Sequence, residues 1–386
     1  MRIDIFNPFL QLKIIKMKIT TLFFTLTLLL SFTTVFSQKD IDDLMKEGIT
    51  LHDAGKYAEA IKKYEEAAKI NPKSTVVNYE MANTFIALED YKKAIKYADK
   101  VIDLKSSNLD EAYMLKGTAY DMMGKPKESI KTYKEGVKVN PLSYLLYFNL
   151  GVTYLKDKQY QEAEMAFFDA IRLKPSHGSS HLQLGNVGTM SGSKTKGLFG
   201  YYFYQLLNPE NRFSPLAFQE IQRMMPFETK KSDKPNVFEL ILPKGGDGDV
   251  TSLDLLIGMM PMMDAMLKDS ANVKIKAAET AKDSAAVKEI LKKMVPSNAF
   301  EAFALRNSRI FKSAGEMLEK EKKDRTMWWK FYAKFFSDLE KAGHTEAFSY
   351  HISKPSKNAT VVKWVEHNGD KLQKMSDWVA EYPFSH

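Results

Sequence analysis

The sequence predicts an all-α protein, in which an α-solenoid of about five helix-turn-helix repeats is followed by a mainly helical C-terminal domain. Two observations predict this fold class. Small residues, rings and prolines recur at a nearly constant interval through the first half of the chain, and apolar residues follow helical spacing from Thr251 onward. A recurrence of this length is typical of stacked helical repeats, and helical spacing indicates helices packed against a core.

A secretory signal peptide is predicted before the first repeat. The segment that starts at Met17 has the order of a cleavable signal: first a basic residue, then an apolar centre over residues 22–36, then small residues up to Ser37. We therefore expect residues 1–37 to be a signal peptide with an upstream extension, translation starting at Met1 or Met17. An uncleaved anchor is the alternative, because about seventeen apolar residues could just span a bilayer. Cleavage would place the mature protein in the periplasm of a Gram-negative cell or outside the cell.

The charge and the cysteine count limit the partners that we expect. The predicted signal segment holds four basic residues and one acidic residue, so it carries +3 of the formal net charge of +8, and the remaining charges are interspersed. Interspersed charges indicate a solvated surface, so we expect no nucleic-acid partner, with weak attraction to an anionic envelope surface as the alternative. The absence of cysteine excludes disulfides, thiol catalysis, cysteine-ligated zinc and a lipid-modified cysteine. We expect no integral membrane segment after signal cleavage.

Residues 38–209 are predicted to form five repeats. Four sets of equivalent positions recur at intervals of 34 or 35 residues. Two sets are small residues that let the two helices of a repeat approach closely, the third supplies mostly rings that fill the space beside them, and the fourth, mostly proline, ends the second helix. The sets are Gly48, Ala82, Gly117, Gly151 and Gly185; Ala60, Ala94, Ser129, Ala163 and Gly197; Tyr64, Ala98, Tyr133, Phe167 and Tyr201; and Pro72, Ser106, Pro141, Pro175 and Pro209.

This pattern resembles the tetratricopeptide repeat, most clearly over Tyr147–Pro175 and Gly55–Pro72. Five units in register make the resemblance specific, although Pro126 replaces the tyrosine that other units carry at that position. The fifth unit departs further, with Tyr204 at a usually small position and several glycines, and we expect it to be a distorted terminal unit beside a different domain. The resemblance is to tetratricopeptide repeat proteins of the exported bacterial type.

After the repeats we expect a capping helix and linker over residues 210–236 and a mainly helical C-terminal domain over residues 237–386. Serine and proline at the start of Ser214–Met224 favour a helix that seals the exposed end of the solenoid. Val237–Leu242 is the one strand that we expect, and the sequence assigns no role to the C-terminal domain. The expected helix breaks are at Pro296, Gly343, Pro355 and Gly369.

The C-terminal domain contains six aromatic residues within nine positions, in the stretch WWKFYAKFF. On a helical projection the rings and one leucine lie within an arc of about 160°, opposite the charged residues. A helix with two such faces packs against a core by default, and Gly343 supplies its left-handed stop. A groove for a partner and a membrane-surface helix are the alternatives, although the mixed charge of the polar face does not favour a membrane. The apolar residues are Trp328, Trp329, Phe331, Tyr332, Phe335, Phe336 and Leu339.

No motif in the sequence assembles a catalytic or cofactor site. Gly188–Gly197 resembles a phosphate-binding loop, but its glycine spacing is one short and Ser193 precedes the lysine, so we expect a helix–helix turn. The Met-rich run Gly258–Met266 could bind Cu(I), yet without nearby histidine or cysteine we expect it to fill gaps in the packing. His177 and His181 lack a third ligand, and His177 is expected in a loop. We therefore expect no catalytic residue, no cofactor and no metal.

The predicted functional surface is the concave groove of the repeats. In tetratricopeptide repeats the first helix of each unit lines this face, and the resemblance implies that its fifth and ninth positions point inward. The fifth positions hold Met45, Tyr79, Met114, Phe148 and Leu182, and the ninth positions hold Ile49, Asn83, Thr118, Val152 and Asn186. Family members that bind a C-terminal carboxylate carry lysine and asparagine at these positions of the first repeat. Met45 and Ile49 do not match, so we do not expect this groove to bind acidic chaperone tails.

An apolar row with interspersed amides suits an amphipathic helix or an extended segment of a partner, whose backbone groups the amides could bond. The alternative is a row filled by the chain's own C-terminal helices, because a bare apolar groove is poorly soluble. We expect a non-enzymatic periplasmic scaffold or adaptor that binds a peptide or protein segment. The alternative function is an envelope-modifying enzyme, with its active centre in the C-terminal domain and the repeats as substrate holder.

Overall fold

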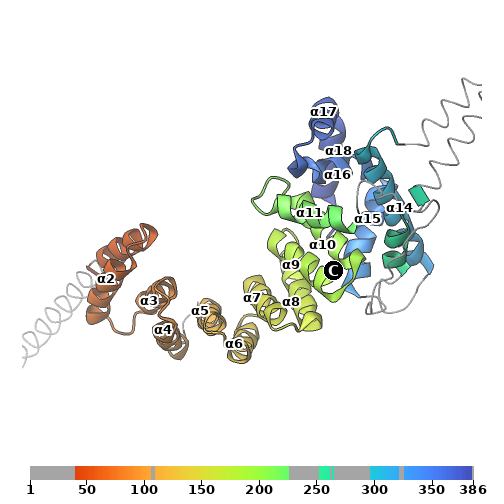
Figure 1. Cartoon of the computed structure of the whole chain (residues 1–386). Coiled ribbons are helices and arrows are strands. Elements are labelled where there is room, and N and C mark those ends of the chain that lie inside the picture. The colour runs from red at the N-terminus through yellow and green to blue at the C-terminus, as the bar shows by residue number, and fades with distance from the viewer. Residues whose placement is uncertain are drawn as a thin grey trace, which may run out of the picture. The chain divides into compact units, whose positions relative to one another are not determined.

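The computed structural model describes residues 40–105, 109–225, 252–260, 263–264, 296–320 and 326–384. Within these ranges the secondary structure is helical and contains no strand, which confirms the predicted all-α class for the described part (Figure 1). The predicted signal peptide, most of the predicted linker and the expected strand Val237–Leu242 lie outside the described residues. Contacts divide the chain into two compact units, an N-terminal unit that ends at Pro141 and a C-terminal unit that begins at Leu142.

The described part of the N-terminal unit forms three helix pairs. Its helices are residues 40–53, α2 (Tyr57–Ile70), α3 (Thr75–Ala87), α4 (Tyr91–Asp103), α5 (Leu109–Met122) and α6 (Pro126–Val139). The turn inside each pair contains a residue with positive φ, and these residues keep the interval of the repeat: Gly55, Glu89 and Gly124. Each turn therefore needs the left-handed conformation at one fixed position, which glycine adopts without strain.

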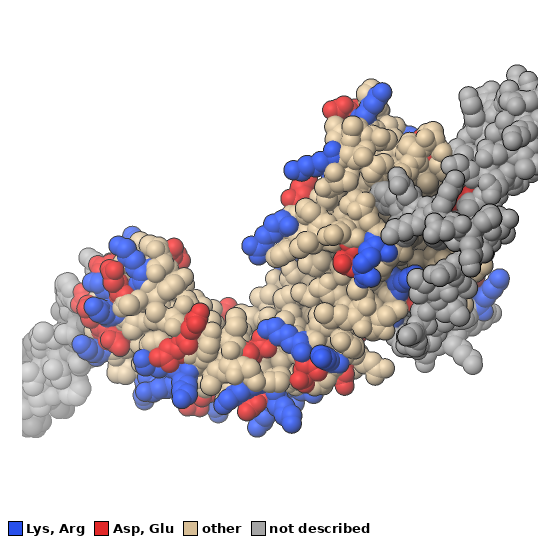
Figure 2. All heavy atoms as spheres, in the orientation of Figure 1, with Lys and Arg blue, Asp and Glu red and all other residues tan. Residues whose placement is uncertain are grey.

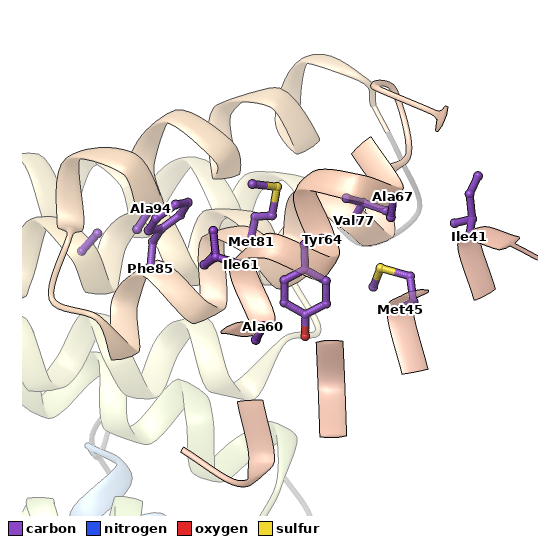
Figure 3. Close-up of a cluster of buried hydrophobic side chains, with 11 residues drawn as sticks. Ile41, Met45, Ala60, Ile61, Tyr64, Ala67, Val77, Met81, Phe85 and Ala94 are labelled. Atoms are coloured by element: carbon purple, nitrogen blue, oxygen red, sulfur yellow. The ribbon is translucent and has the colours of Figure 1, made fainter. Parts of the chain in front are cut away.

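Packing of rings on small residues joins the two helices of a repeat in the N-terminal unit. The ring of Tyr64 lies so close to Gly48 that an added Cβ would overlap it, and the ring of Tyr133 lies in the same way against Gly117. Tyr64 is buried beside Ala60 in the core cluster of this unit (Figure 3). The predicted association of small residues with rings is confirmed, and it explains why the two helices approach closely.

The C-terminal unit contains the fourth and fifth repeats and the helices that follow them. The repeat helices are α7 (Tyr144–Lys156), α8 (Tyr160–Leu173), α9 (Gly178–Ser191) and α10 (Lys194–Leu207), and α11 (Ser214–Met224) follows with the predicted boundaries. The later described helices are residues 252–260, α14 (Ala299–Lys320), the π-helix η1 (Trp328–Ala333), α15 (Lys334–Lys341), α16 (Thr345–Ile352), the short 3₁₀-helix η2 (Lys354–Ser356), α17 (Ala359–His367) and α18 (Gly369–Glu381). All four predicted breaks lie between these helices, at a helix end or in η2.

Helix α10 lies at the centre of the core of the C-terminal unit. Every side chain from Thr195 to Leu206 is buried. The ring of Tyr202 contacts Phe303 of α14 and Phe348 of α16, so helices far apart in the sequence meet on α10. The fifth repeat therefore packs on the later helices within one compact unit. The predicted domain borders at residues 209 and 236 stay a prediction, since contacts group the last two repeats with the later helices.

The aromatic stretch of the C-terminal unit is part of this core, as predicted. Trp328, Tyr332 and Phe335 are buried, and Phe331 is half-buried. Gly343 has a φ of 76° and follows the end of α15, which confirms the predicted left-handed stop. The first part of the stretch is a π-helix and not the α-helix that the projection assumed, so its side chains are distributed over a wider turn.

The surface of the described residues is charged and gives no sign of a membrane segment. No described helix combines the length and the apolar character needed to cross a membrane. On the face shown in Figure 2, basic and acidic side chains lie close together over the N-terminal unit. Mixed charge of this kind is typical of a solvated surface.

Candidate functional site

The first helix of each repeat carries the predicted groove residues. In the N-terminal unit these helices are residues 40–53, α3 and α5. The fifth and ninth positions are four residues apart, so each pair lies about one turn apart on the same face of its helix. Packing of Gly48 on Tyr64 fixes the rotation of the first helix, and with it the residues that this face presents.

A cleft of about 380 Å³ opens between helix 40–53 and the start of α3. Its apolar lining includes Ile41, Met45, Ile49 and Val76. Met45 is only 7% exposed and belongs to the core cluster drawn in Figure 3, whereas Ile49 is 40% and Val76 is 58% exposed. Of the two residues predicted in the first repeat, Ile49 therefore offers the larger surface to a ligand, and Met45 mainly supports it from the core.

The other predicted residues of the N-terminal unit are partly committed to internal packing. They are all half-buried: Tyr79, Asn83, Met114 and Thr118. Tyr79 packs against the small buried cluster that contains Ala82. The hydroxyl of Thr118 lies 3.0 Å from the hydroxyl of Tyr133. Tyr79 and Thr118 are therefore held by internal contacts, and all four side chains keep part of their surface exposed.

Carboxylates lie beside the middle of this surface. Burial raises the pKa of the half-buried Glu80, and the neighbouring carboxylates of Asp53 and Glu111 raise it further, while a hydrogen bond with Asn83 acts in the opposite direction. Burial also raises the pKa of Tyr79, and the charges of Glu111 and Glu80 add to that rise. The apolar row is thus bordered by negative charge in the second and third repeats.

In the C-terminal unit the four predicted residues are also half-buried: Phe148, Val152, Leu182 and Asn186. The ring of Phe148 lies 5.0 Å from that of His177 and 5.9 Å from that of Phe167. Asn186 accepts a hydrogen bond of 2.8 Å from the hydroxyl of Tyr201. Phe148 and Asn186 are therefore held by contacts within the repeats themselves.

The described C-terminal helices meet the repeats through other residues. Trp328 and Tyr332 of η1 pack on Phe168 of α8, and the hydroxyl of Tyr332 lies 2.6 Å from Nδ1 of His181 in α9. The Nε2 atom of His181 lies 2.7 Å from the carbonyl oxygen of Pro175. Since a carbonyl only accepts, Nε2 carries the proton and Nδ1 accepts from Tyr332. Phe168 and His181, which make these contacts, are not among the predicted groove positions.

Other sequence predictions can be compared with the structure. The glycine-rich segment is the turn between α9 and α10, with Gly192 at a φ of 86°, which confirms the predicted helix–helix turn. His177 directly precedes α9, in the loop where it was expected. Met260 is buried, whereas part of the Met-rich run lies outside the described residues. In the described ranges, no three histidine, aspartate or glutamate side chains come together as a metal site.

Sequence reasoning missed part of this surface. Ile41 and Val76 line the cleft, yet they occupy the first and second positions of the repeat register and not the fifth or ninth. The interspersed charge of the sequence predicts only a solvated surface for the acidic residues near Tyr79. The repeat register assigns each residue to the first or the second helix of its repeat. The excess of acidic residues on the first helices could therefore have been found in the sequence.

Comparison with known proteins agrees with this architecture. Two family models, both described as tetratricopeptide repeat, match residues 51–118 and 114–178. Residues 51–178 are therefore tetratricopeptide repeats, which confirms the resemblance inferred from the repeat positions, whereas the exported bacterial type stays a prediction.

The similar proteins share the repeats but not their whole length. The chain is 27% identical over 137 residues to tetratricopeptide repeat protein 6 of Homo sapiens, which covers 34% of this chain and 25% of that protein. It is 30% identical over 106 residues to the Hsp70-Hsp90 organizing protein of Triticum aestivum, which covers 28% of this chain and 18% of that protein. The chain spans less than a third of the length of these curated relatives.

Two solved structures show the same kind of similarity. The protein pilF of Pseudomonas aeruginosa is 18% identical with a TM-score of 0.43, covering 48% of this chain and 85% of that one. A thermophilic tetratricopeptide repeat protein of Thermus thermophilus is 19% identical with a TM-score of 0.40, covering 47% of this chain and 98% of that one.

Proposed function

We propose that the chain is a non-enzymatic scaffold whose first-helix groove binds a peptide or protein segment. Tetratricopeptide repeats support a role in protein interaction. The observation that carries the groove is the pair of exposed apolar side chains, Ile49 and Val76, on a cleft of about 380 Å³. Apolar side chains of a partner gain free energy by leaving water at such a place.

The polar groups along the row support a bound segment with accessible backbone groups. Asn83 is half-buried beside the half-buried ring of Tyr79, and an amide side chain both donates and accepts. An amphipathic helix or an extended strand would place apolar side chains in the cleft and turn its polar groups toward the amide.

The polar groups in the core of the C-terminal unit support a packing role for its helices. The hydroxyl of Tyr202 donates to the side-chain oxygen of Asn307 at 2.7 Å, and the amide nitrogen of Asn307 donates to the hydroxyl of Ser349 at 2.9 Å. These groups satisfy one another between α10, α14 and α16, as buried polar groups in a rigid core do. This favours the scaffold over the envelope-modifying enzyme.

The proposal includes export to the periplasm. Its support is the order of basic, apolar and small residues up to Ser37, which is the order of a cleaved secretory signal. The partner would then be another envelope protein or a segment exposed in that compartment.

A pair of matched double variants tests the groove. Ile49→Ser with Val76→Ser removes the exposed apolar surface of the cleft, and Ile70→Ser with Val139→Ser makes the same two changes on the second helices α2 and α6. Ile70 and Val139 have similar exposure, at 41% and 44%. We expect the first variant to lose partner capture from the cell envelope by at least about tenfold, because two buried aliphatic contacts contribute on the order of 2 kcal/mol.

The control variant should capture the partner normally, and both variants should keep the unfolding midpoint of the parent protein. Intact capture by the cleft variant would contradict the proposal. A large loss of stability in the cleft variant with capture intact would show that the cleft residues serve internal packing.

A further inference from the structure

The repeats of the N-terminal unit carry opposite charge on their two helix layers. The described first helices (residues 40–53, α3 and α5) hold nine acidic residues and two lysines, whereas the second helices (α2, α4 and α6) hold seven acidic residues and eleven lysines. In the C-terminal unit the first helices α7 and α9 together contain one residue of the types Lys, Arg, Asp and Glu, which is Lys156. The acidic excess is therefore specific to the first helices of the N-terminal unit.

Part of this negative charge lies beside the groove residues. Glu80 is half-buried, and its charge interacts with the carboxylates of Asp53 and Glu111. Tyr79 lies near Glu80 and Glu111 as well. His52 offsets part of the charge on Glu80. Because partial burial lowers the local dielectric constant, the half-buried carboxylates of Glu80 and Glu111 act more strongly on a bound group than the exposed carboxylate of Asp53.

The two lysines of the first-helix layer leave this charge in place. Lys116 binds Asp99 of α4 at 2.7 Å, so its charge is paired toward the second-helix layer. Lys46 lines the cleft together with Asp42, so the two charges oppose each other at the start of the groove. The cleft is then mainly apolar, and the acidic part of the groove lies further along the repeats, near Glu80.

We propose that the groove of the N-terminal unit selects a cationic amphipathic segment, with apolar side chains in the cleft at Ile49 and Val76 and lysine or arginine side chains near Glu80 and Glu111. This inference rests on the proposed function and adds the charge of the partner to it. Opposite charge at the groove attracts and orients such a segment. The lysines of the second helices α4 and α6 repel such a segment, so the charge pattern also disfavours binding to the second-helix layer.

Three labelled peptides of about 14 residues test the inference on the whole chain. One is an amphipathic peptide of leucine and lysine, and in the other two every lysine is replaced by glutamine or by glutamate. Fluorescence anisotropy gives their affinities in about 0.05 M and about 0.5 M salt. We expect the lysine peptide to bind about ten times more tightly than the glutamine peptide, the glutamate peptide to bind most weakly, and the difference to shrink in high salt, where charges are screened.

Two charge variants locate the effect. Asp53→Asn with Glu80→Gln removes two charges beside the groove, and we expect it to weaken binding of the lysine peptide roughly five- to tenfold. Glu59→Gln with Glu66→Gln removes two charges from the outer helix α2, and we expect it to keep the preference. Since both variants have the same net charge, a difference between them reports the position of the charge and not its sum.

The possible results separate this inference from the proposed function. Equal binding of the three peptides, lost in Ile49→Ser with Val76→Ser, would overturn the charge preference and leave the scaffold proposal standing. Binding that this cleft variant leaves unchanged would place the contact outside the groove and overturn both. If Glu59→Gln with Glu66→Gln on α2 abolished the lysine preference as fully as Asp53→Asn with Glu80→Gln, the preference would be an effect of net charge. That result would overturn the inference. Self-association in sedimentation that excludes the peptides would assign the groove to a second copy, which also overturns it.

Discussion

Glycine in the first helix of a repeat is required by the ring that lies sixteen positions later. The rings of Tyr64, Tyr133, Phe167 and Tyr201 each lie within overlap distance of a Cβ built on the matching glycine. In the second repeat the ring is absent, and Ala82 packs with Ala98 in a small buried cluster. This pairing of residue sizes could be predicted from the sequence, because both members recur at the interval of the repeat.

A substitution at one of these glycines tests the packing. Gly117→Ala places a Cβ 2.5 Å from Cε1 of Tyr133, so the ring or a helix must move. We expect a loss of about 1–3 kcal/mol in the free energy of unfolding, measured with denaturant. Gly369→Ala is the control, because its Cβ would meet nothing within 4 Å, and it should change stability by less than about 0.5 kcal/mol. Equal effects of the two substitutions would contradict the account.

We expect two histidines of the C-terminal unit to make its stability depend on pH. Burial lowers the pKa of His181 to about 3 and the pKa of His351 to about 4, although hydrogen bonds to the carbonyl oxygens of Pro175 and Leu206 act in the opposite direction. Both histidines are therefore neutral in the folded protein at pH 7. The unfolded chain takes up protons near pH 6.5, so the contribution of the neutral histidines is present above that pH and is lost as the pH falls below it.

We expect acidification from pH 7.5 to pH 5 to lower the free energy of unfolding by up to about 2 kcal/mol for each of these histidines. His181→Gln and His351→Gln should each reduce the slope of stability against pH below pH 6.5, whatever they do to stability at neutral pH. Denaturant unfolding at several pH values measures this slope. An unchanged slope in both variants would show that other groups cause the acid sensitivity.

At the scale of elements, the positions of the helices could be predicted from the sequence better than the contacts between them. Proline and glycine mark chain positions that an α-helix does not continue through, so the ends of α11 and the breaks of the C-terminal helices could be predicted. The enclosure of α10 and the hydrogen bond between His181 and Tyr332, which are 151 residues apart, leave no periodic trace in the sequence. The π-helix η1 was missed because a projection at 100° per residue assumes an α-helix throughout.

Phe335 tests whether the aromatic stretch is core. It is fully buried, and its ring contacts those of Phe203, Tyr382 and Phe384. Phe335→Ala should lower the free energy of unfolding by about 3–5 kcal/mol, because it leaves a cavity that rigid neighbours do not fill. Leu305→Ala on α14 changes an exposed side chain and should cost less than about 1 kcal/mol. If Phe335→Ala lowered the free energy of unfolding no more than the control does, the stretch would not be core. The alternative that it forms a groove for a partner would then be favoured.

At the scale of the whole molecule, the sequence predicted the repeats and most groove positions but not the grouping of the helices. The repeat period runs through Pro141 without interruption, yet contacts divide the chain between Pro141 and Leu142. This grouping depends on which rings of the later helices reach α8 and α10, and only the three-dimensional structure shows those contacts. The groove residues were assigned by register alone, so cleft residues at other positions, such as Val76, were missed.

Export remains a prediction that a mass measurement can test. The mature protein should begin at Gln38 and be released with the periplasmic fraction, because the apolar centre before Ser37 is expected to be cleaved off. Intact-mass spectrometry of the native protein gives the first residue directly. A species that retains residues 22–36 and sediments with membranes would contradict the export proposal.

Photo-crosslinking at the cleft tests the central claim that the groove is open and binds a partner. A photoreactive phenylalanine analogue replaces Val76, which is exposed on the cleft, or Val139 at the end of α6, in cells that express the whole chain. We predict a discrete adduct with another protein from position 76, weaker when Ile49→Ser is also present, and no such adduct from position 139. A crosslink from position 76 to the chain's own C-terminal helices, or equal adducts from both positions, would contradict the account.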